Sequence, residues 1–200
     1  QRVEPKVIRI DLGKASGIIP QSEQIQGEYY SVGARIKVFI KDIERDNRGP
    51  QLILSRGNEQ FIEYLFAQEV PEVESGADEI KAIAREAGRR TKIAVSSTIP
   101  GVDPIGTFVG GHGNRVQAVM NEIGDQEKID IIAYDENINQ FIKNALSPAE
   151  IYKVEVNEEA KRATVYVGED QQSIAIGRAG QNVRLASRLT GYELDIEQTE

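Results

Sequence analysis

A motif of two glycines three residues apart occurs twice in this chain, each time between an apolar run and an amphipathic segment. The first copy reads VGGHGNRVQ over residues 109–117, and the second reads IGRAGQNVR over residues 176–184. By subtraction of residue numbers, one offset of 67 separates three pairs of glycines: Gly110 and Gly177, Gly113 and Gly180, Gly124 and Gly191. A single motif of this kind is common, but a matched tandem pair indicates one structural module used twice.

The glycine motifs predict that backbone atoms bind phosphate. Glycine lacks a Cβ, so a polyanion can approach the amides of such a loop closely. A helix that begins directly after the loop points its unpaired N–H groups and the positive end of its dipole at the same place. Arg178 in the second loop, with Arg115 and Arg184 nearby, would add charge-assisted hydrogen bonds. GXXG loops in KH domains bind about four nucleotides of backbone in this way.

Other interpretations of these residues are weaker. A single loop would fit a tight helix–helix turn equally well, but the matched pair argues against that interpretation. Gly111 and Gly113 resemble the start of a dinucleotide-binding G-x-G-x-x-G, but Val116 occupies its third glycine position. His112, the only histidine, has no second histidine or cysteine to complete a metal site. For His112, a phosphate or stacking contact and an exposed side chain without a specific role remain equally open.

The sequence gives little support for catalysis. No Ser–His–Asp, Cys–His or H-E-x-x-H arrangement occurs, and the acidic residues are scattered. We therefore expect no enzyme, no catalytic residue, no metal site and no cofactor. The absence of cysteine excludes disulfides and fits a reducing cytoplasm. No apolar run approaches the roughly 20 residues that cross a bilayer, so no membrane partner is expected.

The formal net charge of −8 restricts how this chain could bind a nucleic acid. Neutralisation of phosphates favours Lys and Arg, so an acidic chain cannot depend on a broadly basic surface. Residues 1–60 carry ten basic and eight acidic side chains, whereas residues 101–146 carry three basic and seven acidic ones. Binding would therefore depend on local amides and a few arginines, and salt would weaken it quickly.

Hydrophobic periodicity divides the chain into an all-β part and two copies of an αβ unit. Short runs at 7–12, 35–40 and 51–55 predict strands of a small barrel. At 58–70 the apolar spacing becomes three and four residues, which predicts a connecting helix that Pro71 ends. The first unit is expected to contain strands at 79–85, 91–96 and 128–133 and helices ending at Gly110 and spanning 114–123. The second is expected to contain strands at 151–156, 162–167 and 192–196 and helices at 170–176 and 181–189, after a helix at 137–145.

These residues resemble the NusA family of bacterial transcription elongation and termination factors. The stretches that carry the KH resemblance are EIKAIAREAG (79–88), RTKIAVS (90–96), VDPIG (102–106), KIDI (128–131), NALSPA (144–149) and AIGRAGQN (175–182). GIIPQSE at 17–23 and QLILSR at 51–56 are similar to the later strands of an S1 domain. The order S1–KH–KH separates the chain from polynucleotide phosphorylase, in which KH precedes S1.

The resemblance implies a multidomain α+β fold, with an S1/OB-type β-barrel followed by two type II KH domains, each an α/β sandwich. The expected boundaries are 1–57 for an S1 domain with a truncated first strand, 58–76 for a linking helix, 77–147 for the first KH domain and 148–200 for the second. The N-terminal polymerase-binding domain of the family has no counterpart here, so the resemblance also implies that this sequence is a fragment.

The resemblance further implies a region that binds nascent single-stranded RNA and modulates pausing, termination and antitermination by RNA polymerase. We expect it to act as a cytoplasmic monomer alongside other elongation and antitermination factors. The implied RNA-binding residues are Gly110, Gly111, His112, Gly113 and Arg115 in the first KH domain, and Gly177, Arg178, Ala179, Gly180, Gln181, Asn182 and Arg184 in the second. The family usually has a basic residue where His112 stands, so the first loop is expected to bind phosphate less strongly at neutral pH.

Two alternative functions remain open from the sequence. One is an RNA-processing or ribosome-associated factor built from the same S1 and KH modules. The other is a region that acts mainly as a protein-docking surface on RNA polymerase, through its acidic faces.

Overall fold

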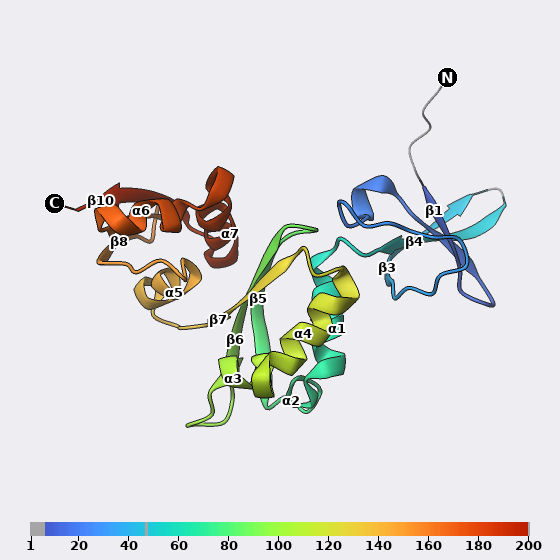
Figure 1. Ribbon diagram of the computed structural model, residues 1–200, viewed down its shortest axis with the longest axis horizontal. Coiled ribbons are helices and arrows are strands. Elements are labelled where there is room, and N and C mark those ends of the chain that lie inside the picture. The colour runs from blue at the N-terminus through green and yellow to red at the C-terminus, as the bar shows by residue number, and fades with distance from the viewer. Residues whose placement is uncertain (1–6, 47, 200) are drawn as a thin grey trace, which may run out of the picture.

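The computed structural model describes residues 7–46 and 48–199. Residues 1–6 and Glu200, at the outer limits of the predicted first and last domains, lie outside the described residues. Three separate sheets follow one another along the chain. Figure 1 shows the four-stranded N-terminal unit at one end of the molecule, the C-terminal αβ unit at the other, and the first αβ unit between them. Within the described ranges, no helix has the length and apolar character that a membrane span requires.

The N-terminal unit is a four-stranded sheet in the order β1-β2-β4-β3. Its strands are β1 (Ile8–Asp11), β2 (Ser16–Ile19), β3 (Phe39–Asp46) and β4 (Gly49–Ser55), and a short 3-10 helix (Gln21–Glu23) follows β2. β2 runs parallel to β4, and the other pairs are antiparallel. The strand predicted at 35–40 starts only at Phe39. Phe39 pairs with Ser55, where β4 ends, so the preceding residues have no strand beside them.

The connecting helix forms as the apolar spacing predicts. In α1 (Glu59–Glu69), the side chain of Asn58 caps the N-terminus by accepting a hydrogen bond from the Gln60 amide, and four apolar side chains are buried. Pro71 ends this helix and at once opens a second short helix, α2 (Pro71–Glu74), which the sequence did not predict. Proline fits there because the first turn of a helix leaves its N–H groups unpaired.

The first αβ unit has the predicted element order. It consists of β5 (Asp78–Glu86), β6 (Arg90–Ser97), α3 (Pro104–Val109), α4 (Asn114–Ile123) and β7 (Lys128–Ala133). β6 pairs antiparallel with β5 and parallel with β7. One face of this sheet packs against α1, α3 and α4 in a core that includes Phe61, Phe66, Ile93 and Phe108. The predicted linking helix is therefore part of the first αβ core.

The second αβ unit repeats this arrangement with a preceding helix. It consists of α5 (Ile138–Ala145), β8 (Lys153–Asn157), β9 (Arg162–Val167), α6 (Glu169–Ile176), α7 (Gln181–Thr190) and β10 (Glu193–Gln198). The sheet order β10-β9-β8 and the parallel β9–β10 pair match those of the first unit.

The second face of the first sheet is covered by the second αβ unit. Ala84, Ala94 and Ile132 of the first sheet share one buried cluster with Phe141 of α5 and Leu185 of α7. Since α5 packs in this second core, the packing favours a boundary between the two units before α5, and not at residue 147. Burial of one continuous apolar cluster also couples the two units mechanically.

The second sheet differs from the first in the residues on its outer face. Ala94 and Ile132, a neighbouring pair on β6 and β7, are buried beneath α5 and α7. The corresponding pair on β9 and β10 is Tyr166 and Glu197, which lie at the surface. No element of the described chain packs on this polar outer face.

Candidate nucleic-acid interface

The two glycine loops have the same backbone conformation. Gly110 has φ 80° and ψ 171°, and Gly177 has φ 77° and ψ 172°. The last loop glycines, Gly113 and Gly180, also agree, with φ 74° and 73° in the left-handed region. At Gly177 an added Cβ would lie 2.7 Å from the Asn182 Cβ, so this position requires glycine for space as well as for its positive φ.

Each loop leaves two backbone amides free at the start of a helix. The Gly113 amide donates to the Gly110 carbonyl at 3.1 Å, and the Gly180 amide donates to the Gly177 carbonyl at 3.1 Å. The amides at the two positions between each pair of glycines have no acceptor anywhere in the described residues. Neither α4 nor α7 has a side-chain N-cap. Each loop therefore offers unpaired N–H groups and a helix dipole to an anion.

An apolar groove of about 430 Å³ runs beside the first loop. Ile105, Val109 and Val116 from α3 and α4 line it together with residues of the edge strand β7. Lys128 adds a positive charge, whereas Arg90 is paired with the Asp130 carboxylate, which also lines the groove. Ser147 and Pro148, between α5 and β8 of the second αβ unit, also line it. The groove thus continues from the first loop toward the second unit. Unstacked bases of a single strand fit such an apolar groove.

Phe108, which precedes Val109 in α3, does not line this groove. Its side chain is fully buried, and its ring centroid lies 5.7 Å from that of Phe66 in the first core. In the second unit, Ile176, Val183 and Ile196 are half-buried and correspond by repeat position to groove residues of the first unit. The second unit therefore keeps apolar side chains at the matching positions.

Arg115 and Asn182 occupy equivalent positions, the second residue of the helix after each loop. The Arg115 guanidinium donates to the Thr107 carbonyl at 2.9 Å and to the Glu72 carboxylate at 3.0 Å. The Asn182 amide group donates to the Ala175 carbonyl at 2.9 Å and to the Leu146 carbonyl at 3.0 Å. Each side chain thus ties the post-loop helix to the helix before the loop.

The sequence predicts Asn182 as an RNA-binding residue, but the structure buries its side chain. Asn182 is fully buried, so RNA has no access to it, and its role is to hold the second loop against the connection between the two units. Arg115 keeps a partly exposed guanidinium, but an ion pair with Glu72 already occupies it. The sequence alone does not predict the ion pair between Arg115 and Glu72, because the two residues are 43 positions apart.

Arg184 and Gln181 of the second unit both contact Glu86 of the first. The Arg184 Nε donates to Glu86 Oε1 at 2.5 Å, and the Gln181 amide donates to Glu86 Oε2 at 3.1 Å. The hydrogen bond from Arg184 lowers the pKa of the Glu86 carboxyl. Arg184 also donates to the Ala179 carbonyl at 3.0 Å and so shapes the loop itself. Sequence reasoning missed Glu86, which is 98 residues from Arg184.

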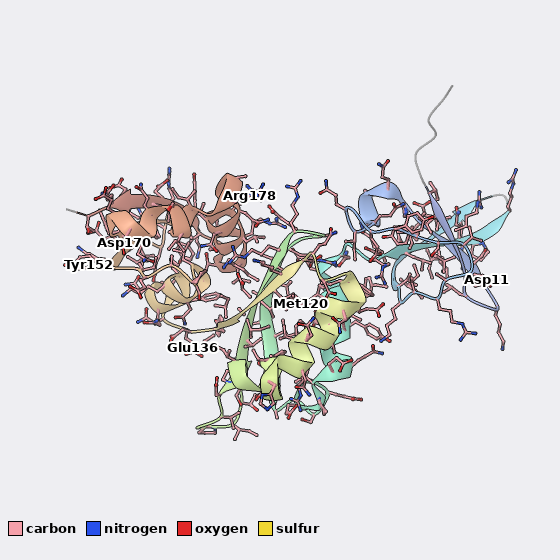
Figure 2. All side chains as sticks on the ribbon, viewed as in Figure 1. Asp11, Met120, Glu136, Tyr152, Asp170 and Arg178 are labelled. Carbon is pink, nitrogen blue, oxygen red and sulfur yellow. The ribbon has the colours of Figure 1, made fainter. Side chains whose placement is uncertain are left out.

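Arg178 and His112 remain exposed at the loop surfaces. Figure 2 shows Arg178 at the outer surface beside α7, where the second loop precedes that helix. Across the described chain, the Arg178 guanidinium has no carboxylate partner, in contrast to Arg115 and Arg184. The second loop therefore presents a free cation beside its two free amides.

The aromatic residues of the N-terminal unit differ in what they expose. Tyr29 is 87% exposed, so its ring face is open to solvent. The Tyr30 hydroxyl accepts a hydrogen bond from the Ile25 amide, and burial raises its pKa to about 12. Phe39 packs against the first αβ core. Only Tyr29 of these three presents a ring on which a base could stack.

The fold and the paired loops define a class of protein: a nucleic-acid-binding region with one S1 domain and two KH domains. Comparison with family models agrees, since residues 1–55 match the S1 RNA binding domain. Residues 56–134 match the NusA-like first KH domain and residues 138–200 match the NusA-like second KH domain. This chain belongs to the NusA family, of which it spans the S1–KH–KH region.

Curated relatives extend the match to nearly the full chain. A protein of Thermus thermophilus named "Transcription termination/antitermination protein NusA" is 51% identical over 96% of this chain and 49% of its own length. Proteins of the same name from Bacillus subtilis and Mycobacterium tuberculosis H37Rv are 46% and 45% identical, over 98% and 95% of this chain and 53% and 55% of their own lengths. The chain thus spans about half the length of these relatives.

The comparisons confirm the predicted family and fold class, with an S1 domain and two KH domains. The relatives are named for transcription termination and antitermination. A solved structure described as "Crystal structure of APE1850" is 22% identical, with a TM-score of 0.47 over 66% of this chain and 96% of that one. That likeness is too distant to bear on function.

Proposed function

We propose that this region binds nascent single-stranded RNA through both glycine loops. We further propose that the protein containing it acts with RNA polymerase in pausing, termination and antitermination, as the names of its relatives suggest for the latter two. RNA polymerase and other elongation factors are its proposed partners, and a cytoplasmic monomer its proposed state. The binding chemistry needs no cofactor, because amides and arginines supply the contacts.

One observation carries the proposal. Two loops 67 residues apart share one backbone conformation, and each exposes a pair of amides without acceptors in the described chain. The direct contacts we propose are the amides of Gly111, His112, Arg178 and Ala179, with the Arg178 guanidinium. Contacts of this type recognise the phosphate backbone and do not read the base sequence.

The placement of the two units supports a single RNA track. The groove beside the first loop is also lined by Ser147 and Pro148, which belong to the second KH unit. A strand bound in this groove would be held near the second loop at high effective concentration. The affinity for a strand that binds both loops would then exceed the affinity of either loop alone. This gain offsets the unfavourable net charge of −8.

The test is RNA binding by two double variants. Gly111→Asp with His112→Asp places carboxylates in the first loop, and Arg178→Asp with Ala179→Asp does so in the second. A Cβ at Gly111 would meet nothing within 4 Å, and aspartate tolerates the left-handed backbone of His112 and Ala179, so the fold is preserved. Each variant should lose roughly tenfold or more in affinity for a 12-nucleotide single-stranded RNA, because carboxylates repel phosphates.

A matched control separates a local effect from net charge. Ala160→Asp with Lys161→Asp changes the formal charge as much as the second-loop variant, at the exposed turn between β8 and β9. Lys161 also has a positive φ of 53°, like Ala179. The control should bind RNA nearly as the wild type does. Unchanged affinity in both loop variants would rule out the glycine-loop mechanism.

The same variants test the docking alternative. If the loop variants bind RNA normally and the region still captures RNA polymerase in a pull-down, it acts mainly as a protein-docking surface. If RNA binding is lost, a transcription termination assay with the full-length protein should show the same loss. A role in RNA processing is less favoured, because both KH units match NusA-like models specifically.

A further inference from the structure

The turn between β5 and β6, residues 85–90, contacts both neighbouring units. It belongs to the first KH unit and lies at one end of that sheet, as Figure 1 shows. The first KH loop is elsewhere in the fold, between α3 and α4. The turn therefore has no place in the RNA contacts proposed above.

Toward the second KH unit, the turn makes three hydrogen bonds. Glu86 accepts from Arg184 and from Gln181, which both lie in the first turns of α7, directly after the second glycine loop. The Arg85 carbonyl accepts from the Arg188 guanidinium at 3.3 Å, one turn further along α7. Contacts spaced along one helix fix both its position and its rotation about its axis.

Toward the S1 unit, the turn is in close backbone contact. Gly88 lies so near the Gln26 carbonyl that any Cβ would overlap with it, and its φ is +81°. The Arg85 guanidinium donates to the Arg56 carbonyl at 2.6 Å and to the Asn58 carbonyl at 2.9 Å, at the junction of β4 and α1. The S1 unit is thus fixed to the same few residues that hold α7.

A buried carboxylate holds the turn itself in shape. Glu127, directly before β7, accepts hydrogen bonds from Arg85 Nε at 2.9 Å, from the Gly88 amide at 2.7 Å and from the Thr91 hydroxyl at 2.6 Å. The Arg85 and Glu127 side chains are both completely buried. A buried ion pair whose hydrogen bonds are satisfied gives a rigid local structure.

We propose that this turn is the positioning element of the region, holding S1, KH1 and KH2 in one arrangement so that one RNA strand reaches both glycine loops. Glu86 is the positioning residue for the second loop, and it acts through Arg184 and Gln181 without touching RNA. The inference rests on the proposed function. It also reassigns Arg184, predicted as an RNA contact, to a role in which its ion pair sets the distance between the two loops.

The test compares two RNA lengths on Glu86→Ala. A 12-nucleotide RNA has room for two sites of about four nucleotides and a spacer, whereas a tetranucleotide occupies one site. Loss of positioning should weaken the long RNA by about tenfold through lower effective concentration and leave the tetranucleotide unchanged. A purely electrostatic effect predicts the opposite change in affinity, because removal of a carboxylate should strengthen the binding of both RNAs. Glu79→Ala is the matched control, since Glu79 lies on the same strand, forms a surface ion pair with Lys81 and removes the same charge.

A structural measurement checks the same variant without RNA. The chain has no cysteine, so spin labels can be placed at Ile99→Cys in the first KH unit and Glu158→Cys in the second, both exposed positions. Glu86→Ala should broaden the distance distribution between the labels, and Glu79→Ala should not. The inference would be overturned if Glu86→Ala kept the wild-type distribution of label distances and the wild-type ratio of affinities for the 12-nucleotide RNA and the tetranucleotide. Failure of the proposed function is distinct, because it would show as normal RNA binding in the two aspartate loop variants.

Discussion

His112 of the first loop and Ala179 of the second have the same left-handed backbone conformation, with φ 55° in both. Neither residue is glycine, although side chains other than glycine cost free energy in this region. The flanking glycines and the helix that follows impose the conformation on whatever residue stands between them. Because the same strained conformation occurs in both copies of the repeat, we attribute it to the function of the loop.

Relief of this strain should be measurable at Ala179. Ala179→Gly should raise the free energy of unfolding by about 0.5–1 kcal/mol, because glycine adopts positive φ without steric cost. Ala179→Val should lower it, since a β-branched residue fits the left-handed region worst. Thermal and urea unfolding of the three proteins provide the measurement. Equal stability of all three would show that the loop is not strained at this residue.

The buried Asn182 should matter for stability more than its exposed neighbours do. Asn182→Ala removes the side-chain donor to the Ala175 carbonyl and one of two donors to the Leu146 carbonyl, which keeps the Ala149 amide. The expected cost is about 1–3 kcal/mol in the free energy of unfolding. Asn114→Ala, at the exposed start of the first post-loop helix, serves as the control and should cost much less. A similar loss in both variants would contradict the anchoring role of Asn182.

The ion pair between Arg85 and Glu127 should be essential to the fold. Glu127→Ala leaves a completely buried guanidinium uncompensated and should lower the free energy of unfolding by about 3–5 kcal/mol. Glu155→Ala removes the partner of Lys153 in an exposed pair and should leave stability unchanged within error. Chemical denaturation of both variants tests this. A stable Glu127→Ala protein would mean that water or another group replaces the carboxylate.

The first loop should gain affinity from a permanent positive charge. His112→Lys should strengthen binding of single-stranded RNA and steepen the plot of log affinity against log salt by about 0.7, the value for one more phosphate contact on a single strand. Ala160→Lys adds the same charge at the β8–β9 turn and should change neither quantity. Titrations at several salt concentrations give both values. An equal gain in the control would indicate a general charge effect.

The contact between the two KH units should weaken in acid. Because the hydrogen bond from Arg184 lowers the pKa of Glu86, the ionised carboxylate stabilises the docked arrangement. This contribution is complete above the ordinary glutamate pKa of about 4.3 and is lost as the pH falls through the lowered pKa of Glu86. The label distance between Ile99→Cys and Glu158→Cys should therefore broaden on acidification, and Glu86→Gln should lack that part of the change. Identical pH profiles would argue against a role for Glu86.

Much of the local structure could be predicted from the sequence. The helix at 114–123 and the strands at 128–133 and 162–167 have the predicted bounds, because glycines and apolar periodicity define their ends. The least accurate prediction was the strand at 35–40. Its pairing depends on where β4 ends, which is a property of the sheet and not of the segment.

The side-chain roles at the candidate site were less predictable. Arg115, Asn182 and Arg184 all read as RNA contacts because they stand beside glycine loops. The structure gives each of them a protein partner, from Glu72, from buried carbonyls and from Glu86. Only Arg178 keeps the free guanidinium that the sequence suggested.

The sequence by itself determined the repeat, the loops and the family. Those features depend on glycine conformation and on hydrophobic period, which act over a few residues and recur at a fixed offset of 67. Only the tertiary structure decided which cations face the solvent and how the three units are joined. Ion pairs such as Arg184 with Glu86 join residues 98 apart, and their formation depends on packing that no local pattern encodes.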